Sequence, residues 1–518
     1  MKKTSPYFKP ISTKVVITNI FMTICIIIIV LVLILIAQGY SLGESGGIER
    51  SGLLELKTKP SFTSISIDDK EQFYQGTFSK ILPAKAHTIS VTKDGYDTWT
   101  SGTKIESGLL TSIDWIRLFP KLQKNRKETV TYLDQARFFD VSPNRKFLVY
   151  LPKDSNELYF YNLESGDSKP TATYNIANLF SSTEVDQSQT SQTDNSTIIE
   201  GNLSISSWNK DEDKFILKVH QSDIDTWSVI NILSPTDNIN LSRQLSLNFT
   251  DLAILNDSAN KLWGLENNNL RILDTTKTLI QDPLDTKVKN FKSHGNTVAY
   301  IKNTTKNNQD LNTLYIRKES AKKSSKVKDF KNDEKYLYDI GHYNKDWLVY
   351  SDTKTVQLLQ GSFASDQKII QTMKRMLSFQ TPFAPTSIVA NPNNRVLLLS
   401  DGKQNTAINI SSLEYNTYSL SPLKTNSWLD HYLTYGTEGK KIVARDFNGY
   451  NQRTVLTDKN LVENSFAAIP KNSNYLYYLV TNNKASSVSD STTTSNQTEN
   501  KTGDSNTQKL IILKRLKL

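Results

Sequence analysis

Two acidic clusters are the first residues in this sequence that could do chemistry: Asp211-Glu212-Asp213 and Asp333-Glu334. Neighbouring carboxylates can hold a divalent cation or act as a general acid and base. The first cluster lacks the D-x-[DN]-x-[DN]-G spacing of a calcium loop, and both clusters lie in expected turns between strands. We therefore predict solvated turns here. A pair of catalytic carboxylates assembled from distant parts of the chain stays an open alternative.

One serine and the five histidines are the next candidates. Residues 39–43 (GYSLG) match G-x-S-x-G, the sharp turn that presents a nucleophilic serine, here Ser41. That turn needs a buried strand before it and a helix after it. Here an apolar segment precedes and a Gly-rich stretch follows, so we expect no catalytic serine. The histidines lack metal-ligand spacing, and we predict scattered surface or strand positions for them: His87, His220, His294, His342 and His431.

The remaining motifs exclude further classes of site. The single cysteine, Cys25, rules out an intrachain disulfide and a cysteine-based zinc site, and we interpret it as a small apolar filler. No phosphate-binding glycine loop, Walker lysine or dinucleotide fingerprint occurs, so we predict no cofactor and no metal. Tryptophans recur on expected strands, which predicts core packing, with a sugar-binding aromatic platform as the alternative. These tryptophans are Trp208, Trp227, Trp263, Trp347 and Trp428.

The elements that must position these side chains begin with an apolar segment. Residues 15–37 carry no charge, and 23 helical residues span about 34 Å, enough to cross a hydrocarbon core of about 30 Å. We predict a transmembrane helix over 15–37, with the lipid bilayer as its partner, after a cytoplasmic tail of residues 1–14. A cleaved signal peptide is the alternative, because residues 37–39 (AQG) resemble a cleavage site.

Charge indicates the orientation of this segment. The chain has a net charge of +10, and four of its 62 basic residues precede the apolar segment with no acid beside them. Basic flanks stay in the cytoplasm, so we expect a single-pass protein of the cell membrane with its N-terminus inside and the chain after residue 40 outside. The rest of the chain has 58 basic and 52 acidic residues, and the basic ones form no stripe in the sequence. We therefore predict no nucleic-acid partner.

Short alternating runs between Gly, Pro and Asp over residues 51–120 predict a small β-sandwich module. We expect a flexible linker before it, at residues 38–50, and a basic linker after it, at 121–132. The segments GLLELKTKP (52–60), ISID (65–68), LPAKAHTISV (82–91) and KDGYDTW (93–99) resemble the PEGA domain, a small extracytoplasmic β-module. The resemblance implies a binding or spacer module at the cell envelope, without catalytic residues.

Residues 133–518 repeat one pattern: a short β run, a polar turn and a second β run. The copies recur at about 40 to 50 residues, the length typical of propeller blades, because radially stacked four-stranded sheets bury faces that a lone sheet exposes. We predict a β-propeller of about seven or eight blades. Polar insertions near 181–202 and 485–508 contain too few apolar side chains to become ordered.

Two of the copies also carry a resemblance. VSPNRKFL (141–148) and DFNGYNQR (446–453) resemble TolB-like and WD40-like propellers, although the WD dipeptide with its Gly-His partner is absent. The whole chain is thus expected to be mainly β: one N-terminal transmembrane helix, a small PEGA-like sandwich and a propeller.

The order of anchor, module and blade array predicts the function. We expect a non-enzymatic scaffold or binding protein outside the membrane, whose propeller contacts an envelope protein or a glycan. Such an assignment rests on analogy between folds. The alternative is a propeller-type hydrolase or lyase with an active site at the mouth of the channel.

Overall fold

The structure is a computed structural model of the 518-residue chain. It describes residues 13–42, 46–121, 128–133, 135–180, 198–363, 369–421, 423, 427–461, 466–472, 474–483 and 509–518. The chain divides into two compact units, Met1–Gln123 and Lys124–Leu518. Most of the expected tail (1–14) and of the expected insertions (181–202 and 485–508) lies outside the described residues.

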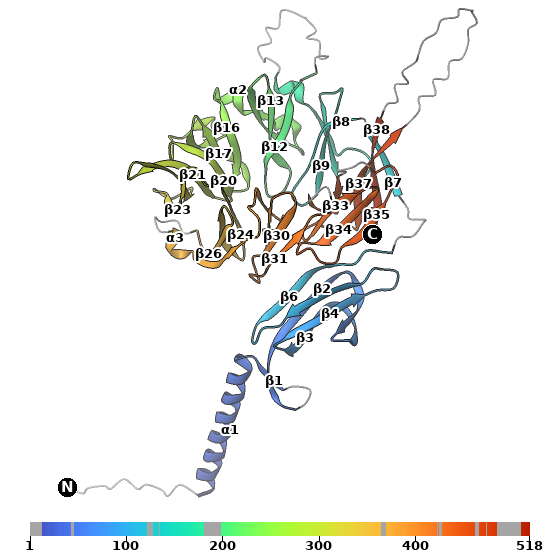
Figure 1. The fold of residues 1–518 in the computed structure, drawn as a ribbon, viewed down its shortest axis with the longest axis vertical. Coiled ribbons are helices and arrows are strands. Elements are labelled where there is room, and N and C mark those ends of the chain that lie inside the picture. Colours follow the sequence, from blue (N-terminus) through green and yellow to red (C-terminus); the bar gives the residue numbers. More distant parts are fainter. Residues whose placement is uncertain are drawn as a thin grey trace, which may run out of the picture. The chain divides into compact units, whose positions relative to one another are not determined.

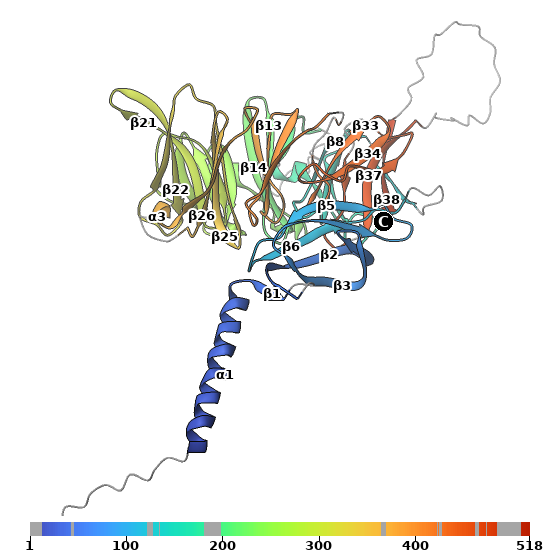
Figure 2. The same cartoon turned by 60° about the horizontal axis from the view of Figure 1, so that its bottom comes forward.

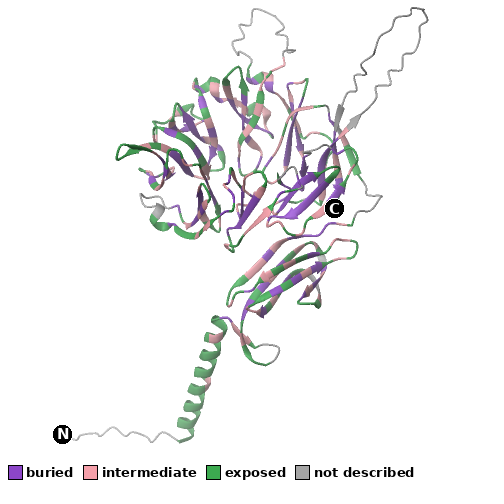
Figure 3. Cartoon of the chain, in the orientation of Figure 1, coloured by how far each residue is buried: buried purple, intermediate pink, exposed green. Residues whose placement is uncertain are grey.

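The first unit begins with helix α1 (Thr13–Ala37), which is long and apolar enough to cross a membrane. Its side chains are almost all exposed, as the predominantly green helix in Figure 3 shows. The polar side chains within it are satisfied locally: Thr18 donates to the carbonyl of Lys14 (2.9 Å) and Thr23 to that of Asn19 (2.8 Å). An apolar N-terminal helix of this kind is typical of a membrane anchor or of a secretion signal.

Six strands follow α1 in the first unit. They are β1 (Tyr40–Leu42), β2 (Ile48–Ile67), β3 (Lys70–Pro83), β4 (Ala86–Thr92), β5 (Trp99–Lys104) and β6 (Leu110–Arg117). The long strand β2 pairs with β3 along its length, with a register shift between Lys57 and Phe62. Before the shift β2 also pairs with β6, and after it with β4. The expected sandwich is therefore one bent sheet that wraps a single core, which includes Leu54, Ile89 and Trp99.

Residues 38–50 differ from the flexible linker that the sequence predicted. In the described part of this stretch, β1 pairs antiparallel with the start of β2, with Tyr40 opposite Arg50 and Leu42 opposite Ile48. Gly and Ser in this stretch suggested flexibility, but the alternation that continues into β2 extends the sheet instead.

The described part of the second unit contains eight four-stranded antiparallel sheets. The first sheet contains β8 (Ala136–Val141), β9 (Phe147–Pro152), β10 (Glu157–Asn162) and β11 (Ala172–Asn175), and the second contains β12 (Asn202–Trp208), β13 (Lys214–Gln221), β14 (Ile224–Asn231) and β15 (Ile239–Asn240). The third contains β16 (Phe249–Leu255), β17 (Ser258–Glu266), β18 (Asn269–Asp274) and β19 (Leu279–Ile280). The fourth contains β20 (Val288–His294), β21 (Thr297–Lys306), β22 (Gln309–Lys318) and β23 (Ser325–Lys331).

The other four sheets complete the array. They are β24 (Tyr336–Tyr343), β25 (Lys345–Asp352), β26 (Thr355–Gly361) and β27 (Lys374–Gln380); β28 (Ser387–Ala390), β29 (Val396–Ser400), β30 (Gln404–Asn409) and β31 (Tyr415–Ser419); β32 (Ser427–Trp428), β33 (Leu433–Glu438), β34 (Lys441–Asp446) and β35 (Arg453–Thr457); and β36 (Ala467–Ala468), β37 (Tyr475–Asn483), β38 (Lys509–Lys517) and β7 (Glu128–Leu133). Short helical turns lie between strands: η1 (Ile176–Leu179), η2 (Pro235–Asp237), α2 (Leu241–Leu245) and α3 (Ile369–Thr372).

These sheets are the blades of a β-propeller, numbered here 1 to 8 in the order above. Figure 1 shows them around a ring, and Figure 2 shows the same ring from a second direction. The first strand of each blade is the inner one, and neighbouring inner strands contact each other from β8 to β28. Apolar side chains fill the spaces between blades, as in the cluster of Phe160 from blade 1 with Phe215 from blade 2.

Blade 8 is built from both ends of the unit. Strand β7, from the segment expected to be part of a basic linker (121–132), pairs antiparallel with β38 near the C-terminus. The propeller therefore begins at β7 and not at residue 133. An apolar cluster that includes Leu148 of blade 1 and Leu479 of blade 8 closes the ring.

The turns after the inner strands share one hydrogen-bond pattern in three blades. The side-chain oxygen at the first turn position accepts the backbone N–H five residues later. The pairs are Ser142 with Phe147 (3.0 Å), Asn209 with Lys214 (2.9 Å) and Asn391 with Val396 (2.8 Å). The fourth residue of each turn is left-handed, at φ 60°, 59° and 59°: Arg145, Glu212 and Asn394.

Candidate functional site

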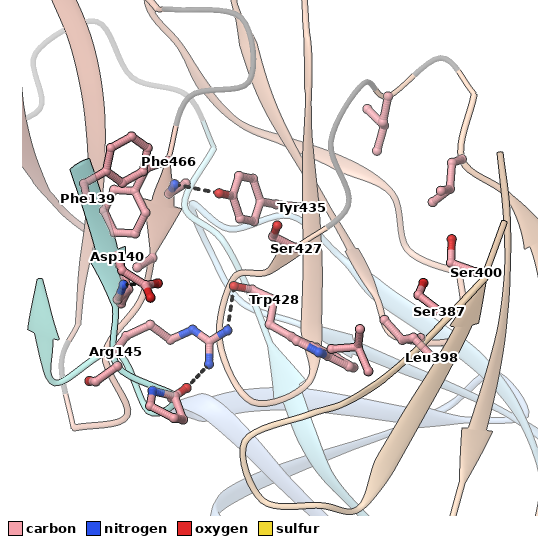
Figure 4. A pocket seen from close by; sticks show the side chains of 18 of the residues that line it. Phe139, Asp140, Arg145, Ser387, Leu398, Ser400, Ser427, Trp428, Tyr435 and Phe466 are labelled. Atoms are coloured by element: carbon pink, nitrogen blue, oxygen red, sulfur yellow. Dashed lines mark hydrogen bonds between the residues drawn. The ribbon is translucent and has the colours of Figure 1, made fainter. Parts of the chain in front are cut away.

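A cavity of about 690 Å³ opens where the inner strands of the propeller are shortest. The inner strands β32 and β36 of blades 7 and 8 have two residues each, whereas β12 and β16 have seven. Side chains of blades 1, 6, 7 and 8 therefore surround a space that longer strands would fill (Figure 4). The lining residues are Phe139, Asp140, Val141, Ser142, Pro143, Arg145, Ser387, Val389, Leu398, Ser400, Gly402, Leu420, Leu423, Ser427, Trp428, Tyr435, Phe466, Ala467 and Ala468.

Asp140, on inner strand β8, is the carboxylate among these lining residues. Its Oδ1 accepts the N–H of Val141 (2.7 Å), and the side chain is half-buried. Burial raises the pKa of this carboxyl to about 6, partly offset by the Val141 hydrogen bond. At neutral pH the group is ionised and able to accept hydrogen bonds from a ligand.

Arg145 is the cation at the cavity, and it is engaged with the protein itself. One of its guanidinium nitrogens donates to the carbonyl of Trp428 in blade 7 (2.8 Å), and another donates to that of Pro143. Burial lowers the pKa of Arg145 to about 10, while Asp430, Tyr435 and Glu212 act in the opposite direction. Arg145 of blade 1 is thus hydrogen-bonded to blade 7, as Figure 4 shows.

Aromatic rings form another part of the lining. Phe139 is 43% exposed and meets Phe466 edge to face, with ring centroids 6.3 Å apart. The buried Tyr435 hydroxyl accepts the N–H of Ala467 (2.9 Å), and burial raises its pKa. Trp428 is 9% exposed. The accessible ring is thus Phe139, which lines the cavity together with Asp140.

The lining residues combine hydrogen-bonding groups with apolar side chains. Nucleophilic catalysis needs a base within hydrogen-bond reach of the nucleophile, and glycoside hydrolysis uses two carboxylates. The described lining contains one carboxylate and no imidazole. Two of its serines are engaged elsewhere: Ser142 donates to Glu212 (2.6 Å) and Ser400 to the carbonyl of Gln404 (3.2 Å). What the cavity offers a ligand is hydrogen bonding and apolar contact.

The acidic clusters singled out in the sequence have different environments. The prediction of a solvated turn is wrong for Glu212, which is 2% exposed. Its carboxylate accepts from Ser142 and from both the backbone and the side chain of Asn144, and so joins the turns of blades 1 and 2. Asp333 is exposed. In the described residues no group of three or more His, Cys, Asp or Glu side chains could hold a metal ion.

The serine, histidine and tryptophan candidates lie apart from one another. Ser41 lies on β1 opposite Glu49, in a strand pair and not in a strand-to-helix turn. His87 is buried in the first unit between Asp68 and the carbonyl of Pro83, with contacts of 2.7 and 2.9 Å. Three tryptophans are core residues, namely Trp227, Trp263 and Trp347. Trp428 is the one that lines the cavity.

The sequence analysis assigned no role to Asp140 or Arg145, although Arg145 lies in the copy VSPNRKFL (141–148) and Asp140 directly precedes that copy. A usable signal was the aspartate that recurs on inner strands. Asp339 of β24 repeats the Asp140 arrangement: its Oδ1 accepts the N–H of Ile340 (2.9 Å), and burial raises its pKa to about 6, with Lys292 acting in the opposite direction. Asp339 does not line the cavity.

No protein-family model and no curated protein matches the chain. The resemblances to the PEGA domain and to TolB-like propellers therefore stay predictions. AztD from Citrobacter koseri is 10% identical, with a TM-score of 0.37 over 79% of this chain and 95% of that one. Dipeptidyl peptidase 4 from Porphyromonas gingivalis is 10% identical, with a TM-score of 0.41 over 68% and 57%. An oligogalacturonate lyase in complex with manganese is 8% identical, with a TM-score of 0.37 over 76% and 98%. Likeness at this level concerns the fold alone.

Proposed function

We propose that this chain is a membrane-anchored binding protein of the cell envelope. Helix α1 holds it in the cell membrane, residues 1–14 stay in the cytoplasm, and the propeller presents its cavity to a glycan or protein partner outside. The uncharged stretch 15–37 of α1 supports the anchor, and the four lysines up to Lys14 support the orientation. The PEGA-like module is proposed as the part that connects anchor and propeller.

The cavity of blades 1, 6, 7 and 8 is the observation that carries the binding role. Its volume of about 690 Å³ lies within the range of about 300 to 1,000 Å³ that small-molecule sites occupy. It is set in a ring of packed sheets, so a ligand would meet groups that are already in position. Such preorganisation reduces the entropy lost on binding.

A glycan is the ligand class that these groups fit best. Sugar hydroxyls can donate to the Asp140 carboxylate, and the apolar face of a sugar ring can stack on the accessible ring of Phe139. A protein partner would use the same pair of contacts by inserting a basic side chain with an apolar stem. Both ligands need the Asp140 carboxylate to be ionised.

The test compares two substitutions that alter the same local structure. We would reconstitute the full chain in lipid nanodiscs and measure binding to a panel of envelope glycans and basic peptides. Asp140→Asn replaces an acceptor oxygen with a donor, so affinity is expected to fall about tenfold or more. Asp339→Asn, on the equivalent inner-strand position outside the cavity, is expected to bind like the natural chain.

Each other outcome has a definite meaning. An equal loss of affinity in both variants, or an unchanged affinity in both, would contradict a binding site at Asp140. Recovery of a cleaved ligand would instead favour the hydrolase or lyase alternative, in which Asp140, with its raised pKa, would serve as the acid or base.

A further inference from the structure

The first unit carries a patch of exposed aliphatic side chains at one end of its sheet. Its members, called here the juxtamembrane patch, are between 39% and 77% exposed: Leu42, Ile48, Leu53, Ile81, Leu109 and Leu110. Clusters of exposed large aliphatic residues mark surfaces that contact a partner or a membrane.

Strand register places three members of the patch on the outer face of the sheet. Leu53 of β2 is paired with Ile81 of β3 on one side and with Leu110 of β6 on the other. Two residues further along, the same face carries a polar row instead. In that row Glu55 is flanked by Ser79 and Ser112. The outer face is thus apolar at one end and polar beyond it.

The apolar end is the end at which α1 enters the module. Only Gln38 and Gly39 separate α1 from β1, and two residues reach at most about 7 Å. That reach is comparable to the polar layer on each side of a membrane, about 5 to 8 Å thick. The start of β1 therefore has to lie within the interfacial layer when α1 spans the hydrocarbon core.

Close contacts also fix the patch beside the end of the helix. The carbonyl of Gly39 accepts the N–H of Ser51 (2.7 Å), and the carbonyl of Ser51 accepts the N–H of Gly108 (2.8 Å). Gly39 has φ +82°, and a Cβ there would lie 2.2 Å from the nitrogen of Gly108. Leu109 and Leu110 follow Gly108 directly, so they are held next to the point where the chain leaves the bilayer.

We propose that the juxtamembrane patch rests in the interfacial layer of the outer leaflet, so that the first unit docks on the lipid surface and does not only hang from its anchor. This inference rests on the proposed membrane anchoring by α1. The side chain of Tyr40 fits it: its hydroxyl accepts from Arg50 Nε (3.4 Å), and Tyr is typical of the headgroup level on both sides of a membrane. Lipid is preferred to a protein partner because the patch is continuous with the membrane-spanning element.

The test uses fluorescence quenching by nitroxide lipids in vesicles of phosphatidylcholine and phosphatidylglycerol. The full chain is labelled at Cys25 in its natural form. In a Cys25→Ser background it is labelled at Leu110→Cys or, as the control, at Thr77→Cys. Thr77 is exposed, lies on the same β3 strand as Ile81 and is about 13 Å from it. A nitroxide in the acyl chain is expected to quench the Cys25 label, and a headgroup nitroxide to quench the label at 110 severalfold more than the label at 77.

Substitutions then separate docking from folding. Leu53→Glu with Ile81→Glu is expected to abolish the quenching at residue 110, because two carboxylates would have to enter the interface. Ser79→Glu with Ser112→Glu adds the same charge to the polar row and is expected to leave the quenching intact. All four side chains lie on the outer face of the sheet, and thermal unfolding of both variants checks that the fold persists.

The outcomes distinguish this inference from the proposed function. An unquenched Cys25 label would contradict the anchor itself. A quenched Cys25 label with equal quenching at residues 110 and 77 would overturn the docking while leaving the anchor in place. Protection of the residue 110 label from aqueous iodide, without quenching by lipid, would overturn it in favour of a protein that covers the patch.

Discussion

Asp140 and Asp339 show how a propeller changes the chemistry of an ordinary side chain. Each lies on an inner strand, accepts the N–H of its next residue and is half-buried. Burial raises the pKa of both carboxyls to about 6 from the ordinary 3.8. The folded protein therefore holds protons at a pH at which the unfolded chain has released them.

This shift predicts a pH-dependent stability. Because the folded pKa lies above the unfolded one, the free energy of unfolding falls as pH rises from about 4 to about 6. Asp140→Asn and Asp339→Asn each remove one titrating group. Relative to the natural chain, each variant should gain about 1 to 2 kcal/mol between pH 4 and pH 8. Urea unfolding across this pH range measures the difference, and a gain that is the same at every pH would contradict the burial of these carboxyls.

Glu212 is a second buried acid of the propeller, and its carboxylate is satisfied by hydrogen bonds from the protein. It is buried more completely than Asp140, but three hydrogen bonds from Ser142 and Asn144 compensate for its desolvation. The buried Glu212 and the half-buried Asp140 thus have different roles. Glu212 joins neighbouring blades, whereas Asp140 has capacity left for a ligand.

At the scale of elements, strand β7 is the contact that joins the two ends of the propeller. It pairs with β38, and Lys514 of β38 contacts Glu128 of β7 (3.1 Å) and Asp458 (2.7 Å). Tyr478 adds a hydrogen bond to Glu128 (2.9 Å). Because β7 comes from the start of the unit and β38 from its end, this pairing holds the two ends of the propeller together in one sheet.

We predict that Lys514→Ala weakens this closure. It would leave Asp458, whose side chain is 9% exposed, without its cationic partner, at a cost of about 2 to 4 kcal/mol in the free energy of unfolding. Lys517→Ala removes an exposed lysine from the same strand and should cost less than about 0.5 kcal/mol. Chemical unfolding of both variants compares the costs. Equal stabilities would show that the two ends are held by backbone pairing and apolar contacts alone.

Strand length also determines where the candidate site lies. β32 and β36 are the shortest inner strands of the eight described blades, and the cavity lies beside them. The inner strands of the other six blades have four to eight residues. The cavity of this propeller thus coincides with its two shortest inner strands.

At the scale of the whole molecule, the proposed topology predicts which residues a protease can reach. Protease added to intact cells, after removal of any outer barrier, should digest the chain beyond residue 40. A tag fused before residue 1 should survive until the membrane is permeabilised. The positive flank before α1 is the physical reason for this orientation.

Two results would contradict this topology. Digestion of the propeller only after permeabilisation would place it inside the cell. A mature chain that begins near residue 38, found in the medium by N-terminal sequencing, would identify α1 as a cleaved signal and remove the basis of the anchor and of the docking on lipid.

Several features were predictable because they depend on short stretches of chain. That α1 is a helix long and apolar enough to cross a membrane follows from 23 consecutive uncharged residues, since a helix satisfies its own backbone hydrogen bonds. The blade strands follow from alternating apolar runs and from polar turns such as that of Ser142. A repeat of about 40 to 50 residues was enough to predict a propeller of seven or eight blades, and eight sheets are described.

Other features depend on which distant segments meet, and a local pattern contains no information about that. β7 looked like a basic linker because its partner, β38, lies more than 350 residues away in sequence. Glu212 looked solvated because the groups that bury it come from another blade. Asp140 received no role because its local sequence does not show which residues surround it. The amino-acid order alone thus determined the elements and their class. The closing of the ring, the cavity and the shifted carboxyl required the tertiary structure, because burial and pairing are properties of side chains brought together in space.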